Sequence, residues 1–202
     1  MVETPVGAPG PSMSNWFVAL PVPVGDWFSQ LSPTPAGTRL LAAADLHLTM
    51  AFLGNVGEAR ARAAFHARPP AAVKPFDIRL GPVVPMGNPR RPSALSASVE
   101  RADATGRLLA ESLVPPRDVI LEAAALPLET RAMKPHVTLA RLRRKASTEE
   151  RQHALAWVAE CDLASIRIRL DRIALYHTAR DRIARAYDIV ESLDLCPPVP
   201  GQ

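Results

Sequence analysis

Stretches of alternating apolar and polar residues recur along the chain and predict β-strands. In the stretch 41–54, LAAADLHLTMAFLG, the side chains of Leu46, Leu48 and Met50 fall on one face of the predicted strand. His47 and Thr49 fall together on the opposite face. A histidine in such a strand is most often a packed residue whose ring nitrogens bond the backbone, so one His-x-Thr pattern does not establish a site.

A second His-x-Thr pattern lies in the stretch 133–143, MKPHVTLARLR. His136 and Thr138 share one face of this apolar, β-prone run, as His47 and Thr49 do in the first. Two matches to this short pattern are weak evidence by themselves. At this composition, roughly 0.5 His-x-Ser/Thr matches are expected by chance. The case for a paired site therefore depends on whether the surroundings of the two patterns repeat as well.

The surroundings do repeat. A helix rich in alanine and arginine is predicted at 57–68, followed by a strand from Phe76, 29 residues after the first histidine. A helix predicted at 148–161, opened by a Ser-Thr-Glu-Glu capping pattern, is followed by a strand from Ile166, 30 residues after the second histidine. The chain thus contains two equivalent sets of elements.

This order predicts an α+β fold of two pseudo-symmetric lobes. A turn-rich basic segment and another alternating strand complete each half, and an early strand, NWFVALPV, and a helix, DATGRLLAESLV, fill the remaining positions. We expect two antiparallel sheets with flanking helices to face each other across a central cleft, with His47 and His136 approaching from opposite sides. Strands suit such a pair because they hold side chains in fixed geometry.

The composition indicates a globular protein. The chain has 202 residues, of which 48% are hydrophobic, and proline-rich ends. We expect a single bilobal domain at 15–196, with mobile tails at 1–14 and 197–202. No apolar stretch approaches the roughly 20 residues of a membrane span, and the first residues lack a basic segment followed by an apolar core. These features predict a cytoplasmic protein with no membrane partner, and we expect it to be a monomer.

The remaining composition bears on possible partners. The net charge is +4, mostly from arginine, whose planar fork suits phosphate recognition. A net charge of this size is compatible with a polyanionic partner and equally with an ordinary solvated surface, so it does not distinguish between the two interpretations. The two cysteines, Cys161 and Cys196, form no CxxC pair and predict neither a disulfide framework nor a cysteine-based zinc site.

The two motifs resemble a known family. HLTMAFLG and KPHVTLAR are similar to the paired His-x-Thr-x signature of the 2H phosphoesterase superfamily, in particular its RNA 2′,3′-cyclic phosphodiesterase branch, also described as 2′-5′ RNA ligases. The opening WFVALPVP agrees with that branch, so the resemblance spans about 16–195. It implies an enzyme whose substrate is RNA or an oligonucleotide with a 2′,3′-cyclic phosphate end.

Two histidines across a cleft have the chemistry for this reaction. One neutral imidazole acts as a base on water while one imidazolium acts as an acid on the departing ribose oxygen. Thr49 and Thr138 are candidate donors to the non-bridging phosphate oxygens. The resemblance adds Arg141 as a phosphate-binding residue. Its odd offset from His136 places it on the wrong face of a regular strand, so this role requires a bulge or twist.

Metal binding is the competing interpretation of the histidines. No HxxxH, HExxH or carboxylate-rich segment lies near either motif, and two histidines alone are an incomplete ligand set. We therefore expect neither a metal nor a cofactor. His66 and His153 fall on predicted helices as surface residues. The sequence assigns no role to His177, nor to Arg90 and Arg91 in the turn of the first half, PMGNPRRPS.

The sequence thus predicts metal-independent hydrolysis of 2′,3′-cyclic phosphate ends to 2′-phosphate ends. The resemblance implies reversible 2′-5′ ligation as a side activity, with His136 as the base that activates water and His47 as the acid that protonates the 3′ oxygen. The alternative is a non-catalytic nucleotide- or RNA-binding module with the same fold. The preferred length and base of the RNA are left open.

Overall fold

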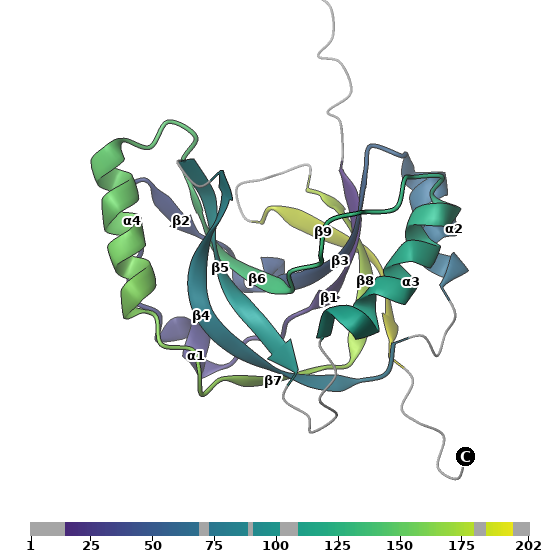
Figure 1. The fold of residues 1–202 in the computed structure, drawn as a ribbon, viewed down its shortest axis with the longest axis horizontal. Helices are drawn as coiled ribbons and strands as arrows, with labels where there is room; N and C mark the ends of the chain where they lie inside the picture. Colours follow the sequence, from purple (N-terminus) through teal and green to yellow (C-terminus); the bar gives the residue numbers. More distant parts are fainter. Residues whose placement is uncertain (1–14, 69–72, 89–90, 102–108, 180–184, 196–202) are drawn as a thin grey trace, which may run out of the picture.

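The structure is a computed structural model that describes residues 15–68, 73–88, 91–101, 109–179 and 185–195. The tails predicted at 1–14 and 197–202 lie outside these residues. The described part is an α+β fold (Figure 1). Its strands are β1 (Trp16–Pro21), β2 (Thr38–Leu40), β3 (His47–Gly54), β4 (Phe76–Asn88), β5 (Arg91–Arg101), β6 (His136–Leu142), β7 (Arg167–Leu170), β8 (Arg172–Thr178) and β9 (Tyr187–Asp194). Its helices are α1 (Asp26–Ser29), a 3-10 turn at Ala43–Asp45, α2 (Glu58–Ala67), α3 (Leu109–Ala123) and α4 (Thr148–Glu160).

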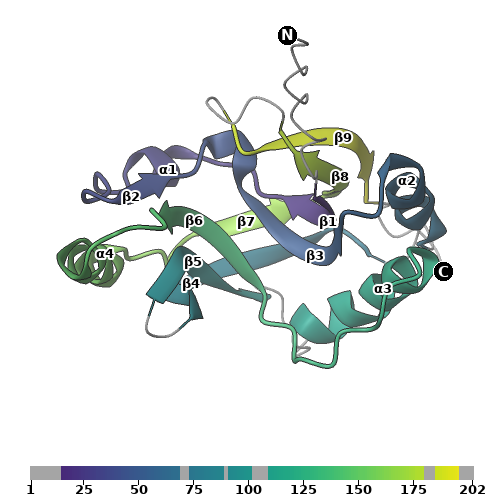
Figure 2. The ribbon, with the colours of Figure 1, turned by 90° about the horizontal axis from the view of Figure 1, so that it is seen from above.

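The two expected sheets are joined into one. The strand order is β7-β4-β5-β6-β3-β1-β8-β9, all neighbours are antiparallel, and β2 adds to β6. Figure 2 shows β3 and β6, the two motif strands, side by side at the centre. They share a single register pair, Leu48 with Val137, and both side chains are fully buried. The prediction of two separate sheets is wrong in this respect, because the motif strands pair where their apolar faces meet one core.

The halves of the sheet also differ from the halves of the sequence. The β4–β5 hairpin follows the first motif but pairs with β6, which carries the second motif. The β8–β9 hairpin follows the second motif but pairs with β1, next to the first motif. Each half of the sheet therefore combines a motif strand from one half of the chain with a hairpin from the other. The repeat spacing alone does not fix this exchange, since it does not say which sheet edge a hairpin joins.

The junction between β7 and β8 shows how strongly the sheet curls. The sequence predicts one long strand from Ile166, but the structure has two strands separated by Asp171 alone. β7 is the last strand at one end of the order and β8 is the second from the other end. Because one residue links strands so far apart in the sheet, the sheet is bent into a half-barrel (Figure 1).

Helices cover the outside of the curled sheet. α2 packs on β1 and β8 and α3 packs on α2 and β3, while α4 packs on β4 and β5 at the opposite side (Figure 1). The predicted capping box is confirmed: Ser147 Oγ accepts a hydrogen bond from the Glu150 N–H, and the Glu150 carboxylate accepts one from the Ser147 N–H.

α3 ends later than the sequence predicts. It continues through Pro115 and Pro116 to Ala123, although proline removes helical hydrogen bonds. Ile120 and Leu121, beyond the prolines, are buried in the core, and this burial favours continuation of the helix. None of the helices in the described residues is long and apolar enough to cross a membrane.

Candidate active site

The two His-x-Thr pairs open onto one cleft. His47 and Thr49 on β3 and His136 and Thr138 on β6 are half-buried and line a hollow of about 380 Å³. The cleft lies where the two motif strands meet in the middle of the sheet. The structure therefore brings together all four of the residues that the motifs predict.

A β-bulge also brings Arg141 into this cleft. Across the β5–β6 pair, Ser96 lies opposite Thr138 and Leu95 lies opposite Ala140, so β6 contains one extra residue. The extra residue reverses the alternation, and Arg141 then faces the same side as Thr138. The odd offset of Arg141 from His136 is thus compatible with a place in the cleft.

The first motif contains the matching bulge. Across β1–β3, Ala19 pairs with Thr49 and Val18 pairs with Ala51, so β3 also gains one residue. The reversal turns Phe52 toward the cleft, where its side chain is 53% exposed. Phe52 follows His47 by five residues, as Arg141 follows His136. An aromatic ring and a guanidinium therefore occupy equivalent positions at the two sides of the site.

Backbone hydrogen bonds fix both imidazole rings in the same way. His47 Nδ1 lies 2.6 Å from the Asp45 carbonyl oxygen, and His136 Nδ1 lies 2.8 Å from the Lys134 carbonyl oxygen. A carbonyl oxygen only accepts, so Nδ1 carries the proton in each ring. When either ring is neutral, Nε2 keeps the free lone pair. Both histidines are thereby set to exchange protons at Nε2.

The surroundings of His47 favour its neutral form. Its ring lies 4.8 Å from the ring of Phe17 and 5.3 Å from those of Tyr176 and Tyr187, measured between centroids. Burial among these rings, with a smaller contribution from the positive charge of Arg141, lowers the pKa of His47 to about 4. Near neutral pH the free protein therefore holds His47 uncharged.

A bound phosphate is expected to raise the pKa of His47, because a negative charge nearby stabilises the imidazolium form. Titration of the histidine ring protons by NMR, without and with saturating inorganic phosphate, measures this shift. The expected result is a His47 signal that titrates near pH 4 in the free protein and at higher pH with phosphate. A His47 signal that titrates near its ordinary value of about 6.5 without phosphate contradicts the burial argument.

Thr138 has a buried polar neighbour. Its Oγ1 lies 3.1 Å from the Oγ of Ser96, a fully buried residue directly across the β5–β6 pair. This hydrogen bond fixes the rotamer of the Thr138 hydroxyl, which needs little further ordering when an anion enters the cleft.

Asp45 is a positioning residue that the sequence analysis missed. Its carboxylate is buried and accepts hydrogen bonds from the Ala186 N–H at 2.8 Å and the Tyr187 N–H at 3.1 Å. Its carbonyl oxygen holds the His47 ring. One residue therefore fixes both the imidazole and the start of β9. The only signal in the sequence is an aspartate two positions before a histidine, which is too common a pattern to interpret.

Tyr187 and Arg39 also line the cleft, although the sequence did not predict them there. The Tyr187 ring meets the His47 ring edge-on, and its hydroxyl accepts a hydrogen bond of 3.2 Å from Arg141 Nη2. Arg39, on β2, lies directly opposite Arg141 in the register of β2 and β6. The positive charge of the cleft is thus gathered on the His136 side.

Several other candidate residues lie away from the cleft. His177 packs against Trp16, with 5.3 Å between ring centroids, and its Nδ1 lies 2.6 Å from the Thr178 carbonyl oxygen. Arg91 begins β5 and does not line the cleft, and Arg90 lies outside the described residues. His66 on α2 lies 3.0 Å from Glu191, and His153 on α4 is exposed to solvent.

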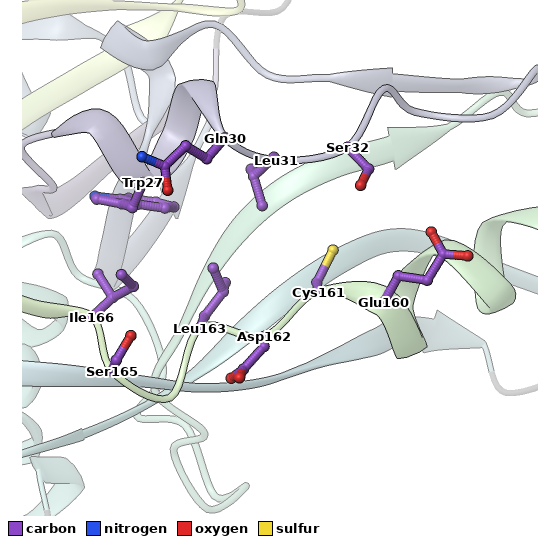
Figure 3. Close-up of a pocket in the computed structure, with 10 residues that line it drawn as sticks. All are labelled: Trp27, Gln30, Leu31, Ser32, Glu160, Cys161, Asp162, Leu163, Ser165 and Ile166. Carbon is purple, nitrogen blue, oxygen red and sulfur yellow. The ribbon is translucent and has the colours of Figure 1, made fainter.

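A second hollow lies between α1 and the segment that follows α4 (Figure 3). Its volume is about 240 Å³, and Trp27, Cys161 and Ile166 are among the residues that line it. None of the residues predicted for the site borders this hollow. In the described part of the chain, no three histidine, cysteine, aspartate or glutamate side chains gather as they would around a metal ion.

Comparison with protein families matches residues 21–182 to the 2′-5′ RNA ligase superfamily. The match covers most of the chain and includes both His-x-Thr motifs. The chain belongs to the 2′-5′ RNA ligase superfamily. These proteins are 2H phosphoesterases, so membership makes the chain a phosphoesterase- or ligase-type protein.

Solved structures agree with the fold of this superfamily. TT0787 of Thermus thermophilus is 24% identical, with a TM-score of 0.60, and the alignment covers 92% of this chain and 100% of that one. LigT of E. coli in apo form is 19% identical, with a TM-score of 0.57, and the alignment covers 90% and 96%. LigT has also been solved with 3′-AMP, at 19% identity, a TM-score of 0.56 and coverage of 90% and 98%. A search of curated protein sequences gave no match.

Proposed function

We propose that this protein hydrolyses the 2′,3′-cyclic phosphate at the end of an RNA chain and leaves a 2′-phosphate. The observation that carries the proposal is the pair of equivalent histidines in one cleft, each with Nδ1 on a backbone carbonyl and Nε2 left for proton exchange. A structure of LigT with 3′-AMP indicates that a member of the superfamily accepts a ribonucleotide carrying a 3′-phosphate. The exposed ring of Phe52 offers a surface on which a nucleobase can stack.

In the proposed reaction, His136 removes a proton from water as the water oxygen attacks phosphorus. The bond between phosphorus and the 3′ oxygen breaks, and His47 gives that oxygen a proton. The hydroxyls of Thr49 and Thr138 donate to the non-bridging oxygens, where negative charge concentrates in the transition state. Arg141 adds positive charge on the same side as His136. Attack and departure then lie on opposite sides of phosphorus.

The acid role of His47 depends on the substrate. Its low pKa in the free protein means that it takes up a proton together with the phosphate, whose charge stabilises the imidazolium. The rings of Phe17 and Tyr187 pack against the imidazole and hold it in place for proton transfer to the departing oxygen. In addition, an acid of low intrinsic pKa donates readily to a basic alkoxide.

A binding module with the same fold is the alternative function. Binding alone requires hydrogen-bond donors to phosphate and does not require two rings with matched tautomers. Turnover distinguishes the two functions. A small amount of enzyme converts a large excess of cyclic phosphate, whereas a binding module leaves the cyclic phosphate intact.

Hydrolysis is expected to continue when EDTA is present in excess, because two histidines and two threonines are short of the three protein ligands of a catalytic zinc site. The measurement is the rate of cleavage of an oligonucleotide with a cyclic phosphate end, with and without EDTA. Unchanged rates support a reaction that uses only protein groups. Activity that disappears in EDTA and returns with zinc or manganese contradicts it.

A further inference from the structure

We propose that a groove beside the cleft binds the phosphate on the 5′ oxygen of the terminal nucleoside, which in RNA is the phosphate that joins it to the preceding nucleotide. This inference rests on the proposed function, since it takes the cyclic phosphate to lie between the two histidines. The groove has a volume of about 440 Å³. It is lined by Gly37, Thr38, Arg39, Arg141, Leu142 and Arg143.

The groove is continuous with the cleft through two arginines. Arg39 and Arg141 line both hollows and lie directly opposite each other on β2 and β6. Like charges in this arrangement destabilise each other unless an anion lies between or beside them. Among the described residues, no carboxylate forms an ion pair with either arginine. The pair therefore carries uncompensated positive charge at the boundary between cleft and groove.

The third arginine of the groove is compensated. Arg143 Nη2 lies 2.6 Å from a carboxylate oxygen of Glu150. The Arg143 backbone N–H donates to the Gly37 carbonyl oxygen at 2.8 Å, and the Leu41 N–H donates to the Leu139 carbonyl oxygen at 2.8 Å. These two bonds hold the ends of β2 against β6. Arg39 thus projects from a strand that is held in place, and this favours specific hydrogen bonding to a phosphate over nonspecific electrostatic attraction.

The two uncompensated arginines differ in direction. Arg141 donates to the Tyr187 hydroxyl, and the Tyr187 ring contacts His47, so the Arg141 side chain extends back toward the histidines. Arg39 lies one strand further out, on β2, and both arginines are exposed to solvent. A chain whose cyclic end occupies the cleft would therefore place its preceding phosphate at Arg39, whose planar fork can donate two hydrogen bonds to it.

The test compares three substrates: adenosine 2′,3′-cyclic phosphate, the same nucleotide with a 5′-phosphate, and the dinucleotide ApA with the same cyclic end. Wild-type protein is expected to show a higher kcat/KM for the two substrates that carry a phosphate on the 5′ oxygen. In Arg39→Gln this preference is expected to fall about tenfold, the usual scale for a hydrogen bond to a charged group. Arg60→Gln removes an exposed arginine from α2, on the outside of the sheet, and is expected to keep the wild-type preference.

A preference that is unchanged in Arg39→Gln overturns the inference. So does a wild-type preference for the 5′-phosphorylated mononucleotide that the dinucleotide does not share, since the groove would then not accept an RNA chain. If wild-type protein cleaves none of the three substrates, the proposed function fails, and calorimetry still tests the groove. Adenosine 5′-monophosphate should then bind more tightly than adenosine to wild-type protein, and Arg39→Gln should lose the difference. Equal binding of the two to wild-type protein contradicts the groove itself.

Discussion

His136→Ala is expected to lower kcat for a 2′,3′-cyclic phosphate at least about 100-fold, the lower end of the usual contribution of general acid–base catalysis. The His136 ring is fixed by the Lys134 carbonyl so that its Nε2 is the proton acceptor. Alanine removes this acceptor, and the neighbouring Thr138 hydroxyl is not a base near neutral pH. His47→Ala is expected to have an effect of similar size, since it removes the other half of the proton transfer.

His153→Ala is the matched control for both variants, because His153 lies on α4 in an exposed position. Its rate should equal that of wild type. Thermal unfolding followed by circular dichroism shows whether each variant is folded before its rate is interpreted. A His136→Ala or His47→Ala protein that is folded and retains nearly the full rate rules out the paired mechanism.

Thr138→Val is expected to lower kcat by about 100-fold, the scale observed when one donor to a transition-state oxyanion is removed. Valine has nearly the same shape as threonine and keeps the strand, but it also removes the hydrogen bond to the Ser96 hydroxyl, so thermal unfolding is compared with wild type before the rate is interpreted. The equivalent change, Thr49→Val, removes the corresponding donor on the His47 side and should act in the same direction.

Thr138→Ser is the control, since it retains the hydroxyl and the neighbouring Ser96 stays in place to orient it. Its kcat should stay within a few-fold of wild type. If Thr138→Val raises KM but leaves kcat unchanged, the hydroxyl binds ground state and transition state equally, and the transition-state role assigned to it is wrong.

The sequence is most informative about single strands. Alternation places His47 with Thr49 and His136 with Thr138 on common faces, and the structure confirms both placements in one cleft. The capping box at Ser147 is also predictable, because it depends on residues three positions apart. Local geometry of this kind follows from side-chain periodicity and needs no knowledge of the rest of the chain.

Features that depend on strand pairing are not predictable in the same way. The bulges that turn Phe52 and Arg141 toward the cleft are visible only when β3 and β6 are seen with their partners. The exchange of hairpins between the halves of the sheet depends on distant edges. Arg39 enters the site because β2 pairs with β6, and a strand this short, between prolines and alanines, gives no such signal in the sequence.

The protonation behaviour of His47 also comes from tertiary structure. Its low pKa results from burial against Phe17, on β1, and Tyr187, on β9. These residues are far from His47 in the sequence. The motif alone gives no sign that the His47 ring is buried among aromatic side chains or that its pKa is lowered. The two motifs also differ in the residue five positions after the histidine, which is Phe52 in the first and Arg141 in the second.

The product of the reaction tests the central claim most directly. Purified protein is mixed with an oligonucleotide that ends in a 2′,3′-cyclic phosphate, and the phosphorus NMR signal of the terminal phosphate is followed in time. We predict that the cyclic phosphate is replaced by a 2′-phosphate, because His136 activates water and His47 protonates the 3′ oxygen. A predominant 3′-phosphate would reverse the roles of the two histidines, and a cyclic phosphate that persists would contradict the proposed activity altogether.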